Sequence, residues 1–343
     1  MLRGFQSTSN TFMKTTLSRV ALNSLSSVAS SSLPAISLNK LSINTPKLKI
    51  PQNSFNLTFQ RFHESCAVDQ QKKRQRKKRI VKKPIPGVKH ILCVTSGKGG
   101  VGKSTVAVNL ALAFQACGKK VGILDADING PSIPKLLALD NELHLNENET
   151  MIIPKEKYGL KCMSMGLLLD DENAAVVWRG VLICDTIKEL IRKVNWSGLD
   201  ILVVDCPPGT GDVHITLSQE LPVSGSVVVS TPQDVAVADV RKGTSMLKEM
   251  KIPIFGLIQN MSYFECPDCG KKNYIFGNND SVKRMCKDMS LDFLGELPLN
   301  STINDDNGKP FVYSQPDSSY SKIFKDIAKK LIGLLGEPKN YIA

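Results

Sequence analysis

Short apolar runs alternate with amphipathic stretches over most of the chain after residue 90. Runs rich in Val, Ile and Leu predict buried strands at residues 91–95, 121–124, 201–205, 226–230, 254–259 and 293–296. Apolar positions at helical spacing between them predict helices at residues 103–117, 180–194, 235–250, 281–288 and 320–335. This alternation indicates an α/β fold with a mostly parallel sheet flanked by helices on both faces. Ligands in such sheets bind at the carboxyl ends of the strands.

The last of these helices has one apolar face bordered by lysines. That face is formed by Ile323, Phe324, Ile327, Leu331, Leu334 and Leu335. A C-terminal helix of this kind packs on its own sheet. Peripheral association with a membrane surface is the alternative.

A glycine-rich turn follows the first predicted strand. Residues 97–104 match the phosphate-loop pattern G-x-x-x-x-G-K-S/T, in which backbone N–H groups and a helix N-terminus surround a polyphosphate. The pattern predicts that Lys103 contacts the β- and γ-phosphates of ATP and that Ser104 binds Mg²⁺. The loop residues expected at the nucleotide are Gly97, Lys98, Gly99, Gly100, Val101, Gly102, Lys103, Ser104 and Thr105. Lys98 is additional to the pattern and indicates a class in which two subunits close face to face over their nucleotides.

Carboxylates follow two further predicted strands. Asp205 comes directly after residues 201–204, which suits a second magnesium-binding carboxylate. Asp125 and Asp127 follow the apolar strand at residues 121–124, and we expect one of them to face the metal and the other the attacking water. We assign Asp127 to positioning the attacking water and Asp125 to Mg²⁺ or to support of the loop, with the reverse order open. The glycine- and proline-rich residues 207–212 suit a loop that rearranges between bound ATP and ADP.

Cys266 and Cys269 form a C-P-x-C turn, which is typical of a metal-binding site. A closed zinc site or a four-iron cluster needs about four ligands, and this turn offers two. One route recruits Cys286 and another group of the same chain. The other pairs the two cysteines of two copies across a two-fold axis, and the face-to-face dimer indicated by Lys98 favours it. A structural zinc turn and unliganded cysteines are the alternatives.

The charge of the chain is concentrated at its start. Residues 1–83 carry sixteen Lys/Arg against two acids, whereas the whole chain is +12, so the remainder is about −2. A nucleic-acid-binding face is therefore not implied for the globular part. Residues 1–63 contain no Asp or Glu and many serines, which predicts a mitochondrial transit peptide over residues 1–65, with a low-complexity tail as the alternative. Residues 66–87 are expected to form a basic flexible linker, with a nuclear signal as the alternative, and residues 88–343 one P-loop ATPase domain.

Several motifs together resemble a known family. They are the phosphate loop and the segments D-A-D-I-N-G-P-S at 125–132, D-C-P-P-G-T-G-D at 205–212, S-T-P-Q at 230–233 and C-P-D-C at 266–269. In this order they resemble the Mrp-type nucleotide-binding iron–sulfur carrier ATPases, within the deviant-Walker (SIMIBI) class of P-loop NTPases. The likeness runs from about residue 84 to 335. With the leader and residues 163–166, 177–180 and 311–316, the chain is most similar to the mitochondrial branch that serves respiratory complex I.

The resemblance implies a homodimer that binds a labile 4Fe–4S cluster at Cys266 and Cys269 of both copies. It implies ATP-linked transfer of that cluster to complex I subunits in the mitochondrial matrix, with ATP hydrolysis that is slow without a recipient. Lys98 would reach the partner's phosphates, and Asn260 would contact the adenine base. Only Cys66 precedes the domain, which differs from cytosolic relatives with an added four-cysteine site.

Two other functions compete with a cluster carrier. A positioning ATPase of the MinD or ParA kind would share the phosphate loop and Lys98, but the C-P-x-C turn and the near-neutral domain argue against it. An ATP-driven electron donor similar to the nitrogenase iron protein would also share a cluster across a dimer. Its two cysteines are far apart in sequence, whereas Cys266 and Cys269 are three positions apart.

Overall fold

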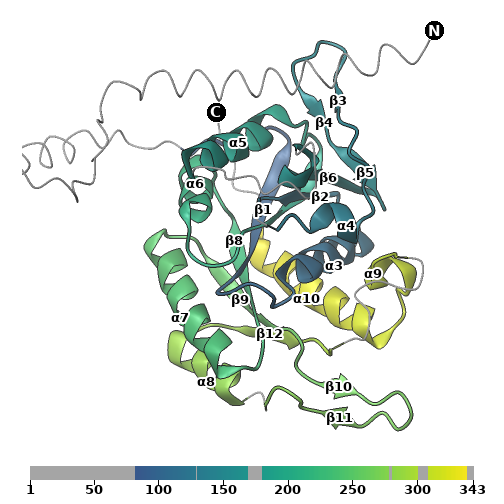
Figure 1. Cartoon of the computed structure of the whole chain (residues 1–343), viewed down its shortest axis with the longest axis vertical. Coiled ribbons are helices and arrows are strands. Elements are labelled where there is room, and N and C mark those ends of the chain that lie inside the picture. The colour runs from purple at the N-terminus through teal and green to yellow at the C-terminus, as the bar shows by residue number, and fades with distance from the viewer. Residues whose placement is uncertain (1–81, 129, 169–179, 278–279, 300–307, 338–343) are drawn as a thin grey trace, which may run out of the picture. The chain divides into compact units, whose positions relative to one another are not determined.

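The central sheet is built from strands that end near the predicted motifs. In a computed structural model, which describes residues 82–128, 130–168, 180–277, 280–299 and 308–337, the strands of this sheet are β1 (Val88–Ser96), β2 (Val121–Asp125), β5 (Lys155–Lys157), β6 (Leu160–Ser164), β7 (Leu199–Asp205), β8 (Gly225–Ser230), β9 (Ile254–Gln259) and β12 (Phe293–Glu296). Their order is β12-β9-β8-β1-β7-β2-β6-β5 (Figure 1). Every pair is parallel except the β5–β6 hairpin at one edge.

Helices cover both faces of this sheet (Figure 1). On one face α3 (Lys103–Ala116) packs against the central strands, joined by α4 (Ile133–Leu136), α9 (Phe311–Ser314) and α10 (Ser319–Leu335). On the other face lie α5 (Gly180–Lys193), α6 (Asp212–Glu220), α7 (Asp234–Glu249) and α8 (Asp280–Met289). A 3₁₀ turn at Met165–Leu168 follows β6. The predicted fold class, a mostly parallel sheet flanked by helices, is confirmed.

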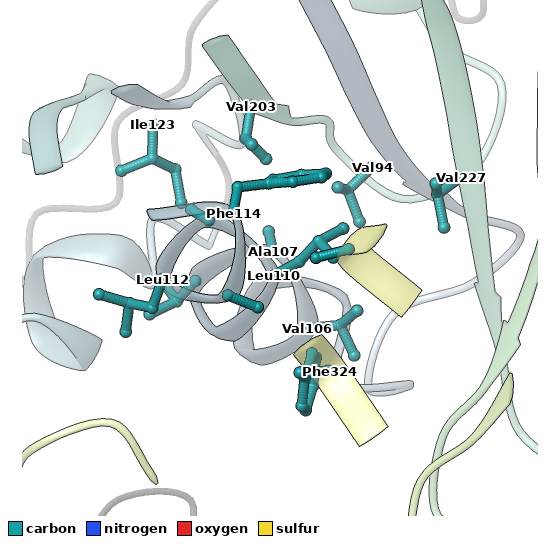
Figure 2. Close-up of a cluster of buried hydrophobic side chains, with 14 of the residues drawn as sticks. Val94, Val106, Ala107, Leu110, Leu112, Phe114, Ile123, Val203, Val227 and Phe324 are labelled. Carbon is teal, nitrogen blue, oxygen red and sulfur yellow. The ribbon is translucent and has the colours of Figure 1, made fainter. Parts of the chain in front are cut away.

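The main core lies between α3 and the sheet. α3 is apolar around most of its circumference because it is covered by the sheet on one side and α10 on the other. Figure 2 shows Leu110 and Phe114 of this helix among Val94, Val203 and Val227 of three strands. Since side chains alternate along a strand, the residues directly before and after each of these valines in its own strand face the helices of the opposite layer. The core therefore fixes the end of β1 relative to the start of α3, where the phosphate loop lies.

The apolar face of α10 is used inside the domain. Phe324, Ile327 and Leu331 are buried against α3, whereas Leu334 near the end of the helix is exposed. The structure thus supplies the packing surface that was expected for this helix. No helix among the described residues is both long and apolar enough to cross a membrane.

Two small hairpins extend from the sheet. β3 (His144–Leu145) pairs with β4 (Ile152–Ile153), and β10 (Phe264–Glu265) pairs with β11 (Lys272–Asn273), both antiparallel. The second hairpin contains the C-P-x-C turn. The strands β5 and β6 and the helix α6 were not among the predicted elements.

The start of the described chain is attached to the domain. The N–H of Lys83 donates to the carbonyl of Glu220 at 3.1 Å, and Arg192 donates to the carbonyls of Lys83 and Pro84, each at 3.0 Å. Ile85 is buried. The chain therefore contacts the domain from Lys83 onward, within the interval expected as linker. The predicted transit peptide and residues 66–81 of that linker lie outside the described residues.

Candidate functional site

The phosphate loop joins the end of β1 to the start of α3. Gly100 and Gly102 have φ angles of 78° and 80°, a region that favours glycine. A Cβ atom at Gly102 would lie 2.2 Å from Nδ2 of Asn260, so close packing also requires glycine there. Because α3 begins at Lys103, the N–H groups of its first turn have no partners within the helix. A loop of this form leading into a helix N-terminus is suited to binding a phosphate.

The ammonium group of Lys103 is buried among carboxylates. Its Nζ lies 2.6 Å from Oδ1 of Asp205 and 3.7 Å from Oδ2 of Asp127. It also donates to the hydroxyl of Ser104 at 3.2 Å. The remaining carboxylate oxygens, Oδ1 of Asp127 and Oδ2 of Asp205, are buried without a hydrogen-bond partner among the described residues. The structure thus brings together a cation, a hydroxyl and two acceptors with spare capacity at adjacent strand ends.

Asp125 holds the loop that follows β2. Its Oδ1 accepts a hydrogen bond from the N–H of Asp127 at 3.1 Å, and its Oδ2 accepts from the N–H of Ile133 at 3.2 Å and the hydroxyl of Ser164 at 2.9 Å. Both oxygens therefore have partners inside the protein. Of the two roles predicted for Asp125, this geometry favours support of the loop, while Asp127 faces Lys103.

Three buried carboxylates share this site with one ammonium. Burial and the neighbouring Asp205 carboxylate raise the pKa of Asp125 to about 7. Burial also raises the pKa of Asp205, although Lys103 opposes the shift. Burial alone would lower the pKa of Lys103, but the attraction of Asp205 and Asp127 outweighs it and raises that pKa. Lys103 therefore stays charged, and the site carries excess negative charge that a divalent cation would neutralise.

Lys98 contacts a second motif of the chain. Its Nζ donates to Oε1 of Gln233 at 3.1 Å, at the residue directly before α7. The hydroxyl of Ser96 donates to the carbonyl of Lys98 at 2.9 Å and fixes the backbone there. The lysine–glutamine bond is exposed to solvent, where one such bond contributes about 1 kcal/mol. Lys98 is therefore held on its own chain by a contact that is weak enough to exchange.

Asn260 connects the end of β9 to the phosphate loop. Its Nδ2 donates to the carbonyl of Val101 at 2.9 Å, and its N–H donates to the carbonyl of Ser230 at 2.7 Å. The next residue, Met261, has a φ of 54°, which costs a non-glycine residue about 1 kcal/mol. Cys266 lies only six positions after Asn260. One short segment therefore links the phosphate loop to the cysteine hairpin.

Cys266 and Cys269 lie in the turn between β10 and β11, on a hairpin that projects from the sheet (Figure 1). The N–H of Cys266 donates to the carbonyl of Lys271 at 3.0 Å, and the N–H of Gly270 donates to the carbonyl of Cys266 at 2.8 Å. Cys266 is partly exposed and Cys269 is exposed. The N–H groups of Cys269 and Asp268 lower the pKa of Cys266. The turn therefore favours the thiolate, which is the form that binds metals.

Cys286, which was considered as a further ligand, and Cys206 are both buried. Cys286 lies inside α8, and burial raises its pKa to about 11. Contact with Cys93 and burial raise the pKa of Cys206. Within the described ranges, no three or more His, Cys, Asp or Glu side chains are arranged to hold a metal ion. In this arrangement the hairpin offers two cysteines, and the burial of Cys286 disfavours the same-chain route.

Some contacts of the site were missed by the sequence analysis. The role of Ser164 as a donor to Asp125 depends on the pairing of β2 with β6, a strand that was not predicted. Gln233 belongs to a quoted motif, but its contact with Lys98 spans 135 positions. The N–H of Gly209 donates to the carbonyl of Ser96 at 2.9 Å, which places the loop after β7 beside the phosphate loop.

A sequence profile for ParA-type proteins described as the NUBPL iron-transfer P-loop NTPases matches residues 87–332. The iron–sulfur cluster transfer protein NUBPL of Dictyostelium discoideum is 46% identical over 260 residues, covering 75% of this chain and 80% of that protein. An Arabidopsis thaliana protein described as an iron–sulfur protein required for NADH dehydrogenase, mitochondrial, is 47% identical over 256 residues, covering 74% and 81%.

A solved structure has the same fold. The nucleotide-binding protein of Archaeoglobus fulgidus in complex with ADP has a TM-score of 0.55 and 34% sequence identity, covering 71% of this chain and 88% of that one. The resemblance inferred from the motifs is therefore confirmed at the level of sequence family and of fold.

Proposed function

Because the chain belongs to the family of NUBPL iron-transfer P-loop NTPases, we propose that it is an ATP-dependent carrier of iron–sulfur clusters. The observation that carries this proposal is the short connection between two sites. Asn260 contacts the phosphate loop, and Cys266 follows six positions later on an exposed hairpin with a second cysteine. A chain built in this way can relate the state of a nucleotide to the state of a thiolate-bound cargo.

The nucleotide is ATP with Mg²⁺, and the residues at the loop fit both. The N-terminal N–H groups of α3 and the ammonium of Lys103 would bind the phosphates. The phosphates would compete with Asp205 for Lys103, and Asp205 would then be available to Mg²⁺ together with the hydroxyl of Ser104. The buried, unpartnered Oδ2 of Asp205 supports this assignment. The cation would supply charge neutralisation at the phosphates.

Hydrolysis of ATP would depend on Asp127 and Lys98. The unpartnered Oδ1 of Asp127 lies beside Lys103 and suits a group that orients the attacking water. Lys98 would leave Gln233 and contact the phosphates held by a second copy of the chain. Asn260 would contact the adenine base while its Nδ2 still donates to the carbonyl of Val101. Hydrolysis serves a conformational cycle in this scheme, so slow turnover without a recipient is expected.

The cargo would be a 4Fe–4S cluster held by Cys266 and Cys269 of two copies. Two thiolates from each copy complete the four ligands that such a cluster requires. The exposure of both cysteines and the lowered pKa of Cys266 suit a cluster that is taken up and released. Since the Arabidopsis relative is described as required for NADH dehydrogenase, we place the recipients among the iron–sulfur subunits of respiratory complex I.

The site of action would be the mitochondrial matrix. Two lines support this placement: the acid-free residues 1–63 and the mitochondrial description of the Arabidopsis relative. Fusion of residues 1–65 to a fluorescent protein should direct it to mitochondria, and a shortened product should accumulate there. A fusion that stays in the cytosol would contradict the placement.

Reconstitution and transfer test the carrier function. The protein is loaded with iron and sulfide without oxygen, mixed with an apo iron–sulfur subunit of complex I, and the recipient's cluster is followed by its absorbance with and without ATP. Cluster appearing in the recipient, at a rate that ATP changes, supports the proposal. A protein that takes up no cluster, and instead binds vesicles or DNA when ATP is added, would support a positioning ATPase.

A further inference from the structure

An exposed apolar segment lies next to the cysteine turn. Tyr274, Ile275 and Phe276 are 45%, 60% and 36% exposed, and they are consecutive. The other large apolar side chains exposed in the described ranges are scattered singly, namely Ile153, Ile215, Tyr313 and Leu334. Single exposed apolar residues are ordinary on a protein surface, whereas a contiguous group indicates a contact surface.

The hairpin ladder fixes how close this segment is to the cysteines. Glu265 pairs with Lys272, and Cys266 donates to Lys271 one step nearer the turn. Continued in the other direction, the ladder brings Tyr274 beside Tyr263, and their ring centroids are 6.0 Å apart. Three ladder steps of about 3.3 Å separate the Tyr274 position from the Cys266 position, a distance of about 10 Å.

The segment is anchored at one end. Tyr263 is buried, and the ammonium of Lys272 lies 4.2 Å from the centre of its ring. Tyr274 therefore rests on a side chain that is fixed in the domain. The apolar surface is presented in a defined place relative to the turn.

We propose that Tyr274, Ile275 and Phe276 form a contact surface for a second copy of this chain, which covers the shared cluster. This inference rests on the carrier function proposed above. The turn of one copy offers two thiolates, so the cluster site is incomplete without the second copy. A two-fold axis through the cluster brings both hairpins together, so the apolar segment that begins about 10 Å from Cys266 comes within reach of the other copy. Their apolar side chains would keep water from the cluster.

The charges of the hairpin agree with this occupant. The hairpin carries exposed acidic residues before and within its turn, Glu265 and Asp268, and exposed basic residues after it, Lys271 and Lys272. In an isologous contact each copy presents both signs to the other and can be self-complementary. A strongly acidic or strongly basic partner would meet like charge on the same hairpin, which disfavours such a partner.

The variant Ile275→Asp tests this surface, with Ile153→Asp as the matched control because Ile153 is 45% exposed on β4, away from this hairpin. Full-length wild type and both variants are reconstituted with iron and sulfide without oxygen. Iron, sulfide and chains per complex are then measured by metal analysis and native mass spectrometry. We expect Ile275→Asp to lower dimer affinity and cluster content at least tenfold while its unfolding midpoint and ATP affinity stay at wild-type values. Ile153→Asp should match wild type throughout.

A second probe separates failure of the surface from failure of the carrier function. Zn²⁺ also takes four ligands, so it should join two reduced copies through the same thiolates. If wild type dimerises with Zn²⁺ but holds no iron–sulfur cluster, the carrier function fails, and the surface stands if Ile275→Asp weakens that dimer. The surface is overturned if Ile275→Asp dimerises as wild type does with both probes, or if wild type dimerises with neither. If Ile275→Asp forms normal dimers with a normal cluster but does not transfer the cluster, the segment contacts the recipient protein and not the second copy.

Discussion

The nucleotide loop and the cysteine hairpin differ in how far one chain completes them. At the loop, Lys103 is 6% exposed and its charge is balanced by Asp205 and Asp127 of the same chain. At the hairpin, strands of two residues present two cysteines at the surface, followed by three exposed apolar residues. The first region has internal partners for its chemistry, whereas the second leaves its chemistry for another molecule. The comparison teaches that the buried, paired Lys103 can bind phosphate within one chain, with only Lys98 proposed to act on the other copy, whereas the exposed half-site of the hairpin needs a second copy for half of its ligands.

Loss of either cysteine should give the largest effect and separate the two regions. We expect Cys266→Ser and Cys269→Ser each to abolish cluster binding, because each removes two of four ligands from a two-copy site. ATP affinity should remain within about twofold, since exposed surface changes usually alter stability by less than about 0.5 kcal/mol. Iron and sulfide analysis and a nucleotide titration measure both. Cys184→Ser on α5 is the control and should keep its cluster. If the hairpin variants lose ATP binding, the cysteine hairpin and the nucleotide loop are not independent binding regions.

Replacement of Lys103 should damage the opposite region. Lys103→Ala leaves two buried carboxylates without their cation, so we expect a loss of about 3 kcal/mol in the free energy of unfolding. ATP affinity should fall by at least about 100-fold because the main phosphate contact is gone, which corresponds to about 2.8 kcal/mol. Denaturant titration and isothermal titration measure the two quantities. Lys98→Ala is the matched control: it should lose at most about 1 kcal/mol in the free energy of unfolding and still bind ATP, but lose hydrolysis. Equal losses in both variants would contradict their different placement.

The stability of the nucleotide region should depend on pH through Asp125. Its pKa is about 7 in the folded protein against 3.8 for an ordinary aspartate, so the folded state holds the proton more tightly. The corresponding stability is present below about pH 4 and is lost as pH rises through about 7. We expect wild type to lose about 2 kcal/mol relative to Asp125→Asn between pH 5 and 7. Denaturant titrations at several pH values measure the difference, and a pH-independent difference would contradict the burial argument.

The smallest expected effect concerns Gln233. Gln233→Ala removes the contact that holds Lys98 on its own chain, which is worth about 1 kcal/mol. If Lys98 has to leave that contact to reach a partner, ATP-dependent dimer affinity should rise by up to about fivefold while binding of ATP to the monomer is unchanged. Analytical ultracentrifugation with a non-hydrolysable ATP analogue measures it. Weaker dimers would instead mean that Gln233 positions Lys98 for the partner.

Much of the fold could be predicted because its central strands are short, apolar and bounded by polar residues. The predicted strand at 254–259 and the predicted helix at 103–117 differ from β9 and α3 by at most one residue. β6 was missed because its apolar residues are interrupted by Lys161, and its partner β5 consists of three charged residues. α6 was missed because it begins inside the motif at 205–212 and contains β-branched residues, which have weak helix propensity.

The loop residues of the site were evident from the sequence, but their internal partners were not. The phosphate-loop pattern predicted that Lys103 contacts a phosphate. Its pairing with Asp205 could not be predicted, because that pairing depends on the register of β1 and β7. The contacts of Asn260 with Val101 and of Lys98 with Gln233 likewise join distant segments. The burial of Cys286, which disfavours the same-chain route to a cluster, follows from the packing of α8.

The number of chains that hold one cluster tests the central claim most directly. Native mass spectrometry of the anaerobically reconstituted protein gives the chains, irons and sulfides in one complex. The account predicts two chains with four irons and four sulfides, and no cluster on a single chain. A single chain that carries a cluster or a zinc ion by itself would contradict the shared site, since the hairpin of one copy would then have found its remaining ligands within its own chain.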